Sequence, residues 1–295
     1  MPTLYLIDAS FFVFRAYHSM PAEMADADGL PVNALYGFAK FIGDLIERER
    51  PEHIAVAFDE SLESSFRNRI YPAYKANREP APVELKHQFE RCRELCRLLG
   101  LAEFASSEFE ADDIIGTLAA SARAHGYRCS IVTRDKDLAQ LVRSGDEFWD
   151  YVADVRIGYD GIPERFGVRP ERIADYLALT GDAVDNIPGV SGIGPKTASA
   201  LLAEFSSLED IYTNIDRVTR LGIRGAASVA ARLAADRETA FLARELTRIV
   251  CDAPFAHAPS GLRRNAPQIG ALADFYDRAG FGSMLRRQAE RIAGH

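Results

Sequence analysis

The sequence lacks the features that would anchor a chain in a membrane or in a disulfide framework. Its 295 residues include four cysteines: Cys92, Cys96, Cys129 and Cys251. None of them has a Cys or His neighbour at the spacing of a zinc site, so we expect free, buried thiols in a reducing compartment. The N-terminus lacks the basic start of a signal peptide, and no uncharged apolar run is long enough to span a membrane. These absences predict a cytoplasmic protein.

The spacing of apolar residues predicts an α/β protein with a helical second part. The chain has no internal repeat or low-complexity tract, and its 47% apolar content is enough to build the core of one large or two modest domains. Strand-like and helix-like runs alternate in the first half, which favours a mostly parallel sheet flanked by helices. The expected strands are 3–8, 53–59 and 128–133, and the expected helices are 33–50, 83–99 and 111–125. From about residue 160, helical periodicity replaces the strand signal.

Nine acidic residues lie in short groups that close apolar runs. They are Asp8, Asp59, Glu110, Asp112, Asp113, Asp135, Asp137, Asp182 and Asp185. Any one of them could be an ordinary turn residue or a helix-capping acid. Five of them, however, follow strand-like runs or begin the next helix, which is where open α/β sheets bind ligands. Because converging carboxylates repel one another unless hard cations such as Mg²⁺ neutralise them, the pattern predicts a metal-dependent hydrolase.

The net charge of −8 is compatible with a polyanionic partner once these acids are set aside. Removing the nine acids, which metal ions would partly neutralise, leaves +1 for the rest of the chain. Basic residues are dense in two stretches, which permits a groove that follows a phosphate backbone. They are Arg67, Arg69, Lys75, Arg78 and Lys86 in one stretch and Arg263, Arg264, Arg286, Arg287 and Arg291 in the other. For the C-terminal stretch, a solvated charged face is the favoured interpretation.

The most specific motif is IPGVSGIGPKTASALL, residues 187–202, in which glycines separate two helical patterns. Its glycines are Gly189, Gly192 and Gly194, and Lys196 and Thr197 follow them. Glycines permit positive φ and leave backbone N–H groups open at the start of a helix, where the dipole also favours an anion. A plain helix-turn-helix corner could use one such glycine. Three of them favour a clamp that holds nucleic-acid phosphates without reading bases.

With these motifs the chain resembles the 5′ nuclease family, most closely the 5′ to 3′ exonuclease domain of bacterial DNA polymerase I and the phage flap endonucleases. The resemblance runs from Leu4 to about Ile249. It rests on RAYHSMP at 15–21, FRNRIYPAYKANREPAP at 66–82, EADDIIGTLA at 110–119, DKDLAQLV at 135–142 and LALTGDAVDNIPGVSGIGPKTA at 177–198. Because no polymerase follows, the chain resembles either a free-standing nuclease or an excised nuclease domain.

The resemblance implies a fold in three parts. These are a PIN-like α/β nuclease core at 1–160 with a helical arch near 62–90, a helical subdomain at 161–260 with a helix-hairpin-helix near 172–205, and a C-terminal helical extension at 261–295. It also implies a bacterial, nucleoid-associated protein that acts in DNA replication and repair as a monomer.

The resemblance assigns the acids to two metal environments. It places Asp8, Asp59, Glu110, Asp112 and Asp113 in one and Asp135, Asp137, Asp182 and Asp185 in the other. It implies two or more Mg²⁺ or Mn²⁺ ions and leaves open a K⁺ ion at the helix-hairpin-helix. The implied reaction hydrolyses phosphodiester bonds by a two-metal-ion mechanism without a side-chain nucleophile. The implied partner is DNA with a 5′ flap, a nick or a single-stranded 5′ end, including RNA-primed ends.

The arch would supply the cations for this reaction. Lys75 and Arg78 are three residues apart, so a helix there would direct both at the scissile phosphate. Nearby prolines instead suggest a loop that orders on binding. The family motifs also make Tyr74 and Arg15 expected DNA contacts. Tyr17 and His18 belong to the same motif as Arg15 but could equally be packed core groups.

One residue, Arg134, departs from the family pattern. Polymerase-type relatives usually carry a small residue there. Its guanidinium would either pair with a ligand carboxylate and weaken a metal site, or contact the substrate phosphate.

Three other classes fit less well. A haloacid-dehalogenase-type phosphatase needs a second Asp two residues after Asp8, where this chain has Ser10. A PIN-fold ribonuclease would share the acids but lacks the glycine hairpin, and a non-catalytic DNA-binding scaffold would tolerate lost acids.

Overall fold

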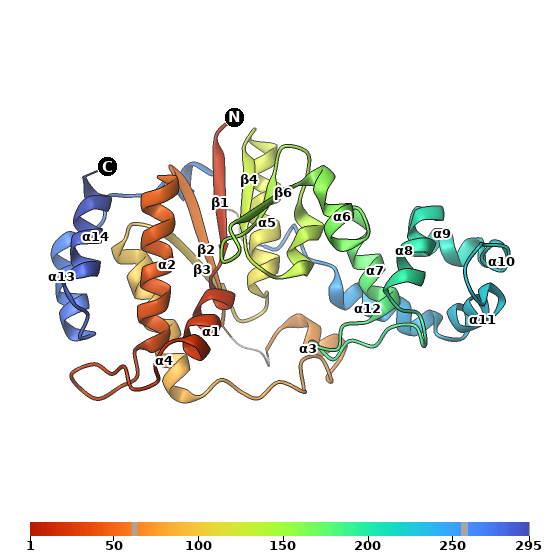
Figure 1. Ribbon diagram of the computed structural model, residues 1–295, viewed down its shortest axis with the longest axis horizontal. Coiled ribbons are helices and arrows are strands. Elements are labelled where there is room, and N and C mark those ends of the chain that lie inside the picture. The colour runs from red at the N-terminus through yellow and green to blue at the C-terminus, as the bar shows by residue number, and fades with distance from the viewer. Residues whose placement is uncertain (61–63, 255–258, 295) are drawn as a thin grey trace.

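A single mixed sheet lies at the centre of the molecule (Figure 1). The computed structural model describes residues 1–60, 64–254 and 259–294. Six strands of this part pair in the order β3-β2-β1-β4-β5-β6. They are β1 Thr3–Asp8, β2 His53–Asp59, β3 Ala102–Ser106, β4 Arg128–Val132, β5 Glu147–Asp150 and β6 Val155–Gly158. All neighbours pair in parallel except β5 and β6, so the expected α/β class with a mostly parallel sheet is confirmed.

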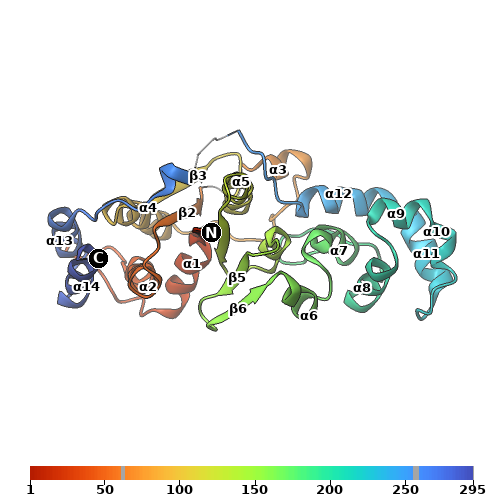
Figure 2. The same cartoon turned by 90° about the horizontal axis from the view of Figure 1, so that it is seen from above.

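Helices cover both faces of the sheet and then continue as an all-helical part (Figures 1 and 2). Before β5 they are α1 Ala9–Ser19, α2 Asn33–Glu49, α3 Phe66–Ile70, α4 Val83–Leu98, α5 Ala111–Ala124 and the 3₁₀-helix η1 Lys136–Leu141. After β6 come η2 Tyr159–Gly161, α6 Ile162–Phe166, η3 Pro170–Arg172, α7 Ile173–Thr180, α8 Pro195–Glu204, α9 Leu208–Thr213, α10 Ile215–Val218, α11 Ala226–Ala235 and α12 Arg237–Thr247. The last helices are η4 Pro259–Leu262, α13 Ile269–Arg278 and α14 Ser283–Ala293.

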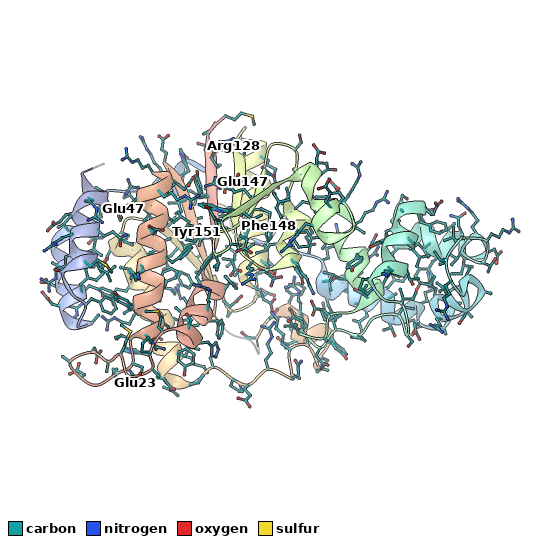
Figure 3. The ribbon with its side chains drawn as sticks, in the orientation of Figure 1. Glu23, Glu47, Arg128, Glu147, Phe148 and Tyr151 are labelled. Carbon is teal, nitrogen blue, oxygen red and sulfur yellow. The ribbon has the colours of Figure 1, made fainter. Side chains whose placement is uncertain are left out.

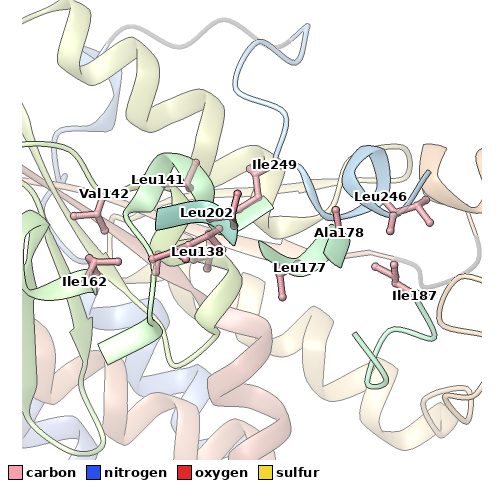
Figure 4. Close-up of a cluster of buried hydrophobic side chains, with 14 of the residues drawn as sticks. Leu138, Leu141, Val142, Ile162, Leu177, Ala178, Ile187, Leu202, Leu246 and Ile249 are labelled. Atoms are coloured by element: carbon pink, nitrogen blue, oxygen red, sulfur yellow. The ribbon is translucent and has the colours of Figure 1, made fainter. Parts of the chain in front are cut away.

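Two hydrophobic cores form because successive strand residues point to opposite faces of the sheet. Leu6 on β1 and Ala57 on β2 pack toward α5, whereas Ile7 and Val56 pack toward α2. The core on the α5 side continues into the helical part, where a cluster that includes Leu177 joins it (Figure 4). The sheet therefore connects both cores.

The C-terminal helices α13 and α14 return to the sheet end of the molecule. They lie beside α2, at the opposite end from α10 and α11 (Figures 1 and 2). Phe275 and Leu285 are buried in the same core as α2. The segment 261–295, expected as a C-terminal helical extension, contains two helices that pack onto the α/β core.

Most of the expected elements have nearly the expected bounds. Strands 3–8 and 53–59 match, and the other four elements end one residue early. The expectation missed α1, because β1 ends and α1 begins at consecutive residues: the carboxylate of Asp8 accepts from the N–H of Phe11 and caps the helix. It also missed β3, whose residues are all half-buried and include the ion-paired Glu103.

Two absences concern the described residues. None of the helices there combines the length and apolarity needed to cross a bilayer. The four cysteines are free, but only Cys92, Cys96 and Cys129 are buried. The expectation of a buried thiol is wrong for Cys251, which lies exposed in the segment after α12.

Helices α1 and α2 approach so closely that a side chain at position 37 does not fit. A Cβ on Gly37 would lie 2.5 Å from the Cβ of Ala16, which cannot swing aside. We expect Gly37→Ala to lower the free energy of unfolding by about 1–3 kcal/mol through overpacking, as measured by urea denaturation. Gly270→Ala is the matched control, because a Cβ there meets nothing within 4 Å. Equal stability of the two variants would contradict the close approach.

Candidate active site

Acidic side chains converge at the carboxyl edge of the sheet. β1 ends at Asp8, β2 ends at Asp59, α5 begins directly after Glu110, and Asp135 follows β4 by three residues. β3, β2, β1 and β4 are parallel neighbours in this order, so their carboxyl ends lie along one edge. The chain builds outward from β1 on one side and returns to add β4 on the other. Open α/β sheets bind ligands at such a switch in strand order.

Local hydrogen bonds hold these carboxylates in place. Asp8 accepts from the hydroxyl of Thr133 at 2.8 Å, across from the neighbouring strand. Asp59 accepts from the N–H of Ala111 at 2.9 Å and so ties the end of β2 to the start of α5. Asp135 accepts from the N–H of Asp137 at 2.9 Å. Each of these acids therefore also caps or braces an element.

Burial and neighbouring charges raise the proton affinity of several of these carboxylates. Burial, followed by the charges of Asp59 and Asp135, raises the pKa of Asp8 from 3.8 to about 7. Burial and then the charge of Asp135 likewise raise the pKa values of Asp112 and Asp137 well above their usual range. A site of this kind favours either protons or cations.

The loop between α7 and α8 brings the last two acids to the same edge. Asp182 and Ile187 exchange two backbone hydrogen bonds, at 2.9 and 2.8 Å, which close the loop. The ammonium of Lys136 lies 3.0 Å from Asp182, and the charges of Asp182 and Asp185 contribute to the raised pKa of Asp137. The four acids of the second expected group therefore do come together.

The segment between α3 and α4 supplies basic and phenolic groups to the acids. Lys75 Nζ lies 3.0 Å from Glu110 Oε2 and 3.8 Å from Asp185 Oδ2. The hydroxyl of Tyr74 donates to the same Glu110 oxygen at 3.0 Å, and Arg78 pairs with Asp185. Burial alone would lower the pKa of Lys75, but the charges of Glu110 and Asp185 outweigh it and raise that pKa. Burial would raise the pKa of Glu110, but Lys75 and Arg67 lower it, so both groups are charged.

Of the two alternatives for the segment of Lys75 and Arg78, a helix or a loop, the structure has the loop. Residues 71–82 form turns, a bend and irregular segments, and Lys75 has a φ of 54°. Proline disfavours the helical region for the residue before it, which explains why the helical run does not extend through this Pro-rich stretch. Both cations nevertheless reach Asp185. Of the arch expected near 62–90, residues 62 and 63 lie outside the described residues.

The remaining donor set fits hard cations. All candidate ligands are carboxylates, the oxygen ligands that Mg²⁺ prefers. Glu110 Oε1 and Asp137 Oδ1 are buried and have no hydrogen-bond partner within the part of the chain that the structure describes. Such orphaned oxygens are unusual and suit an ion. In the ranges 1–60, 64–254 and 259–294, no three acidic, His or Cys side chains converge tightly enough to hold an ion alone. Mg²⁺ commonly keeps several water ligands and needs only one or two carboxylates.

Asp113 does not join the other acids. It is fully buried, and its two oxygens accept from the guanidinium of Arg67 at 2.6 and 2.8 Å. The N–H of Val250 also donates to it at 2.9 Å. Because these donors occupy the carboxylate, we no longer expect Asp113 to bind a metal.

The glycine hairpin has the expected position between α7 and α8. Gly192 has a φ of +67°, which favours glycine, and a Cβ on Gly189 would lie 2.3 Å from the backbone N of Gly181, which leaves no room for a side chain. Gly194 caps α8 and has no atom near its Cβ position, which leaves the helix start open. Lys196 and Thr197 follow in the first turn, where Lys196 is exposed.

Arg15, an expected DNA contact, lies away from the nine acids. Arg15 is exposed on α1 and lines a groove of about 640 Å³ between α1, α2 and α14, whose lining includes none of the nine acids. Tyr151, which forms one wall of this groove, lies beside α2 (Figure 3). Arg134 pairs with Asp150 at 3.5 Å and not with any of the nine acids. The alternative in which Arg134 pairs with a ligand carboxylate is therefore wrong for this structure. His18 is exposed and is not a core group.

Sequence reasoning missed three side chains at this site. Arg67, Thr133 and Lys136 all contact the acids directly. Thr133 and Lys136 flank Asp135 in the chain, so their position in the motif was a usable signal. Arg67 stood in a basic stretch that indicated only a solvated face or phosphate binding, and its burial was not visible there.

A pH prediction follows from Asp8. Its folded-state pKa of about 7 exceeds 3.8, so the folded state binds more protons between these values and stability falls as pH rises through them. In buffer with EDTA, we expect Asp8→Asn to raise the melting temperature at about pH 8 and to leave it nearly unchanged at about pH 4. Adding Mg²⁺ should stabilise the wild type most at the higher pH. An exposed Asp28→Asn variant is the control, and the same pH profile for both variants would contradict the clustering.

The fold and the site together define a class. An α/β core of PIN-like form carries acids at the switch in strand order, and a helical part with a glycine hairpin follows it. Two family models match the chain in this arrangement: "5′-3′ exonuclease, N-terminal resolvase-like domain" over residues 3–167 and "5′-3′ exonuclease, C-terminal SAM fold" over residues 168–269. The chain belongs to the 5′-3′ exonuclease family.

Relatives from bacteria agree with this membership. The "5′-3′ exonuclease" of Aquifex aeolicus is 35% identical over 272 residues, which cover 92% of this chain and 90% of that protein. The "DNA polymerase I" of Rhizobium leguminosarum is 39% identical over 294 residues, which cover 97% of this chain. This chain spans only 28% of the length of that polymerase.

Two solved structures share the fold. A T5 5′-exonuclease with bound divalent metal ions (zinc) matches with a TM-score of 0.67 and 22% identity, over 99% of this chain and 98% of the other. The catalytic core of Rad2 in complex with DNA substrate matches with a TM-score of 0.66 and 14% identity, over 99% and 91%.

Proposed function

We propose that this chain is a metal-dependent 5′ to 3′ exonuclease and structure-specific flap endonuclease that hydrolyses phosphodiester bonds at or near the 5′ ends of branched or nicked DNA. The observation that carries the proposal is the meeting of Lys75, Glu110 and Asp185, which come from three separate segments. A cation between carboxylates from the core and from the hairpin loop suits a phosphate substrate that bridges both. Membership of the 5′-3′ exonuclease family supports the same activity.

The eight remaining acids form the proposed metal site. They are Asp8, Asp59, Glu110, Asp112, Asp135, Asp137, Asp182 and Asp185. When bound there as a pair, Mg²⁺ or Mn²⁺ ions would supply an activated water and neutralise charge on the phosphate. The metal-bound T5 relative supports this choice of cofactor class.

The chain's own cations act on the substrate. Lys75 is held within 3.0 Å of Glu110 and is charged, so its ammonium can stabilise the charge that develops on the phosphate. Tyr74 donates to the same Glu110 oxygen and fixes its direction. Arg78 pairs with Asp185 beside them and can take a phosphate oxygen in its place. No side-chain nucleophile is needed.

The hairpin is the proposed anchor for duplex DNA. The helix start at Gly194 has free space at the Cβ position, and Lys196 is exposed beside it; this arrangement suits phosphate oxygens of any base sequence. The hydrogen bond from the N–H of Ser191 to Asp236, at 2.8 Å, holds the hairpin shape. We also propose that a K⁺ ion binds at this hairpin. A comparison of DNA binding in K⁺ and Na⁺ buffers would test it.

We also propose the three-part layout, with a nuclease core at 1–160, a helical subdomain at 161–260 and the segment 261–295. The end of β6 at Gly158 and the helices that follow support the first boundary. Residues 255–258, near the second boundary, lie outside the described residues.

The first test is cleavage of a labelled 5′-flap DNA beside a nicked duplex and a single strand. We expect cutting only with Mg²⁺ or Mn²⁺. Because losing a metal ligand removes several kcal/mol of transition-state stabilisation, Asp182→Ala should slow the single-turnover rate by about 100-fold or more. Flap binding should change little. Asp154→Asn, at an exposed acid outside the site, is the control. An Asp182→Ala protein with near wild-type cleavage rates at saturating Mg²⁺ would refute the proposed metal site.

The second test concerns the hairpin. A Cβ at position 194 meets nothing within 4 Å, so we expect Gly194→Val to keep the fold while its side chain covers the helix start. Losing one hydrogen bond to a charged phosphate, worth about 1.5–3 kcal/mol, should weaken binding at least about tenfold, equally for all sequences. Fluorescence anisotropy and thermal melts should be measured together. Gly261→Val, which also has open space, should bind normally, and unchanged binding by Gly194→Val would rule out the phosphate contact.

A further inference from the structure

A buried ion pair lies next to Glu110, one of the acids of the site. Arg67 on α3 is 3% exposed, and Asp113 on α5 is 0% exposed. The guanidinium and the carboxylate meet through two parallel hydrogen bonds, at 2.6 and 2.8 Å. Such a bidentate pair fixes both the distance and the orientation of its two elements.

The remaining donors of Arg67 reach the helical part of the chain. Its Nε donates to the carbonyl of Leu246 at 2.8 Å, and its Nη2 donates to the carbonyl of Arg248 at 3.0 Å. In return the N–H of Val250 donates to Asp113. The pair therefore joins α3 and α5 to the C-terminal end of α12. Side chains from this end, such as Ile249, pack into the shared apolar cluster (Figure 4).

The same pair adjoins the carboxylate at the centre of the site. Arg67 Nη1 lies 3.6 Å from Glu110 Oε2, the oxygen that Lys75 and Tyr74 also contact. The backbone N–H of Glu110 donates to Asp113 at 3.1 Å. Both the backbone and the side chain of Glu110 are thus tied to the pair.

We propose that Arg67 and Asp113 are positioning residues that hold the core acids and the hairpin-loop acids in one working geometry. Helix α12 packs along α7, and α7 leads directly into the loop that carries Asp182 and Asp185. A shift of α12 against α5 would therefore separate the two acid groups that share one substrate. Reactions at such sites are sensitive to displacements of about 1 Å. This inference rests on the proposed function.

Stability alone does not account for the pair. A buried ion pair is often no more stabilising than apolar side chains of the same volume, because both charges lose their hydration. Its directional bonds, in contrast, specify where three segments meet. The pair therefore serves geometry more than stability.

The chain offers a matched control in Arg123 and Asp146. Arg123 Nε donates to Asp146 at 2.8 Å, and its Nη2 donates to the carbonyl of Leu141 at 2.6 Å. Asp146 is 6% exposed and also accepts from the N–H of Cys129. This pair has the same chemistry as Arg67 and Asp113 but contacts none of the nine acids.

The experiment compares Arg67→Lys and Asp113→Asn with Arg123→Lys and Asp146→Asn in the full chain. We expect all four to lower the melting temperature, but only the first two to slow single-turnover flap cleavage at saturating DNA, each by about 100-fold. The loss in the double variant Arg67→Lys/Asp113→Asn should be no larger than in either single variant, because the two residues act as a unit. Calorimetric Mg²⁺ binding to the DNA-free protein should weaken equally in both single variants.

Three outcomes would overturn the proposal. In the first, the Arg67 and Asp113 variants lose only thermal stability and keep wild-type rate and Mg²⁺ binding. In the second, the control variants lose as much rate. In the third, Asp113→Asn loses Mg²⁺ binding while Arg67→Lys does not, which would make Asp113 a ligand.

Two safeguards keep the test decisive. If Arg67→Lys fails to fold, Arg67→Met with Asp113→Leu removes both buried charges together and should fold yet remain slow. Wild-type activity in that double variant would count against the proposal. If the wild type cuts no DNA, the proposed function fails, while the Mg²⁺ titration still tests the positioning role.

Discussion

Mutual repulsion among carboxylates at one edge of the sheet is the constraint on which the rest of this structure depends. The parallel pairing of β1, β2 and β4 brings these side chains together whatever their charge. Burial and the neighbouring acids raise the pKa of Asp8 to about 7, so the protein holds a proton where an isolated aspartate would release it. Burial and repulsion of this kind favour a neutral cluster, which is reached by binding protons or, as we propose, cations.

Basic side chains from distant segments offset that repulsion in two different ways. Lys75 and Lys136 each pair with one acid of the site, Glu110 and Asp182, at 3.0 Å. Arg67 instead donates hydrogen bonds to Asp113 and to two backbone carbonyls. Glu110 and Asp113 are only three residues apart, yet one faces the site and the other faces the helical part.

Much of the architecture was predictable because it is encoded locally. Strands 3–8 and 53–59 alternate with amphipathic helices, and that periodicity survives in the folded chain. The glycine hairpin was equally readable, since the positive φ at Gly192 favours glycine and the close backbone approach at Gly189 leaves no room for a side chain. The turn through Lys75 was only partly readable: the spacing allowed a helix and the prolines indicated a loop, but the path of the chain also depends on the hydrogen bond from Lys75 N–H to the carbonyl of Asp185.

The sequence by itself determined the alternation of elements, the set of acids and the open glycine loop, because each depends on neighbours a few residues away. Only the tertiary structure decided which acids share a site. Asp112 and Asp113 are adjacent in the chain and alike in chemistry, but successive helix positions point about 100° apart. The charges of Asp135, Asp8 and Asp59 therefore act on Asp112, whereas the carboxylate of Asp113 accepts hydrogen bonds from Arg67. That choice depends on contacts across more than forty residues, which no local pattern records.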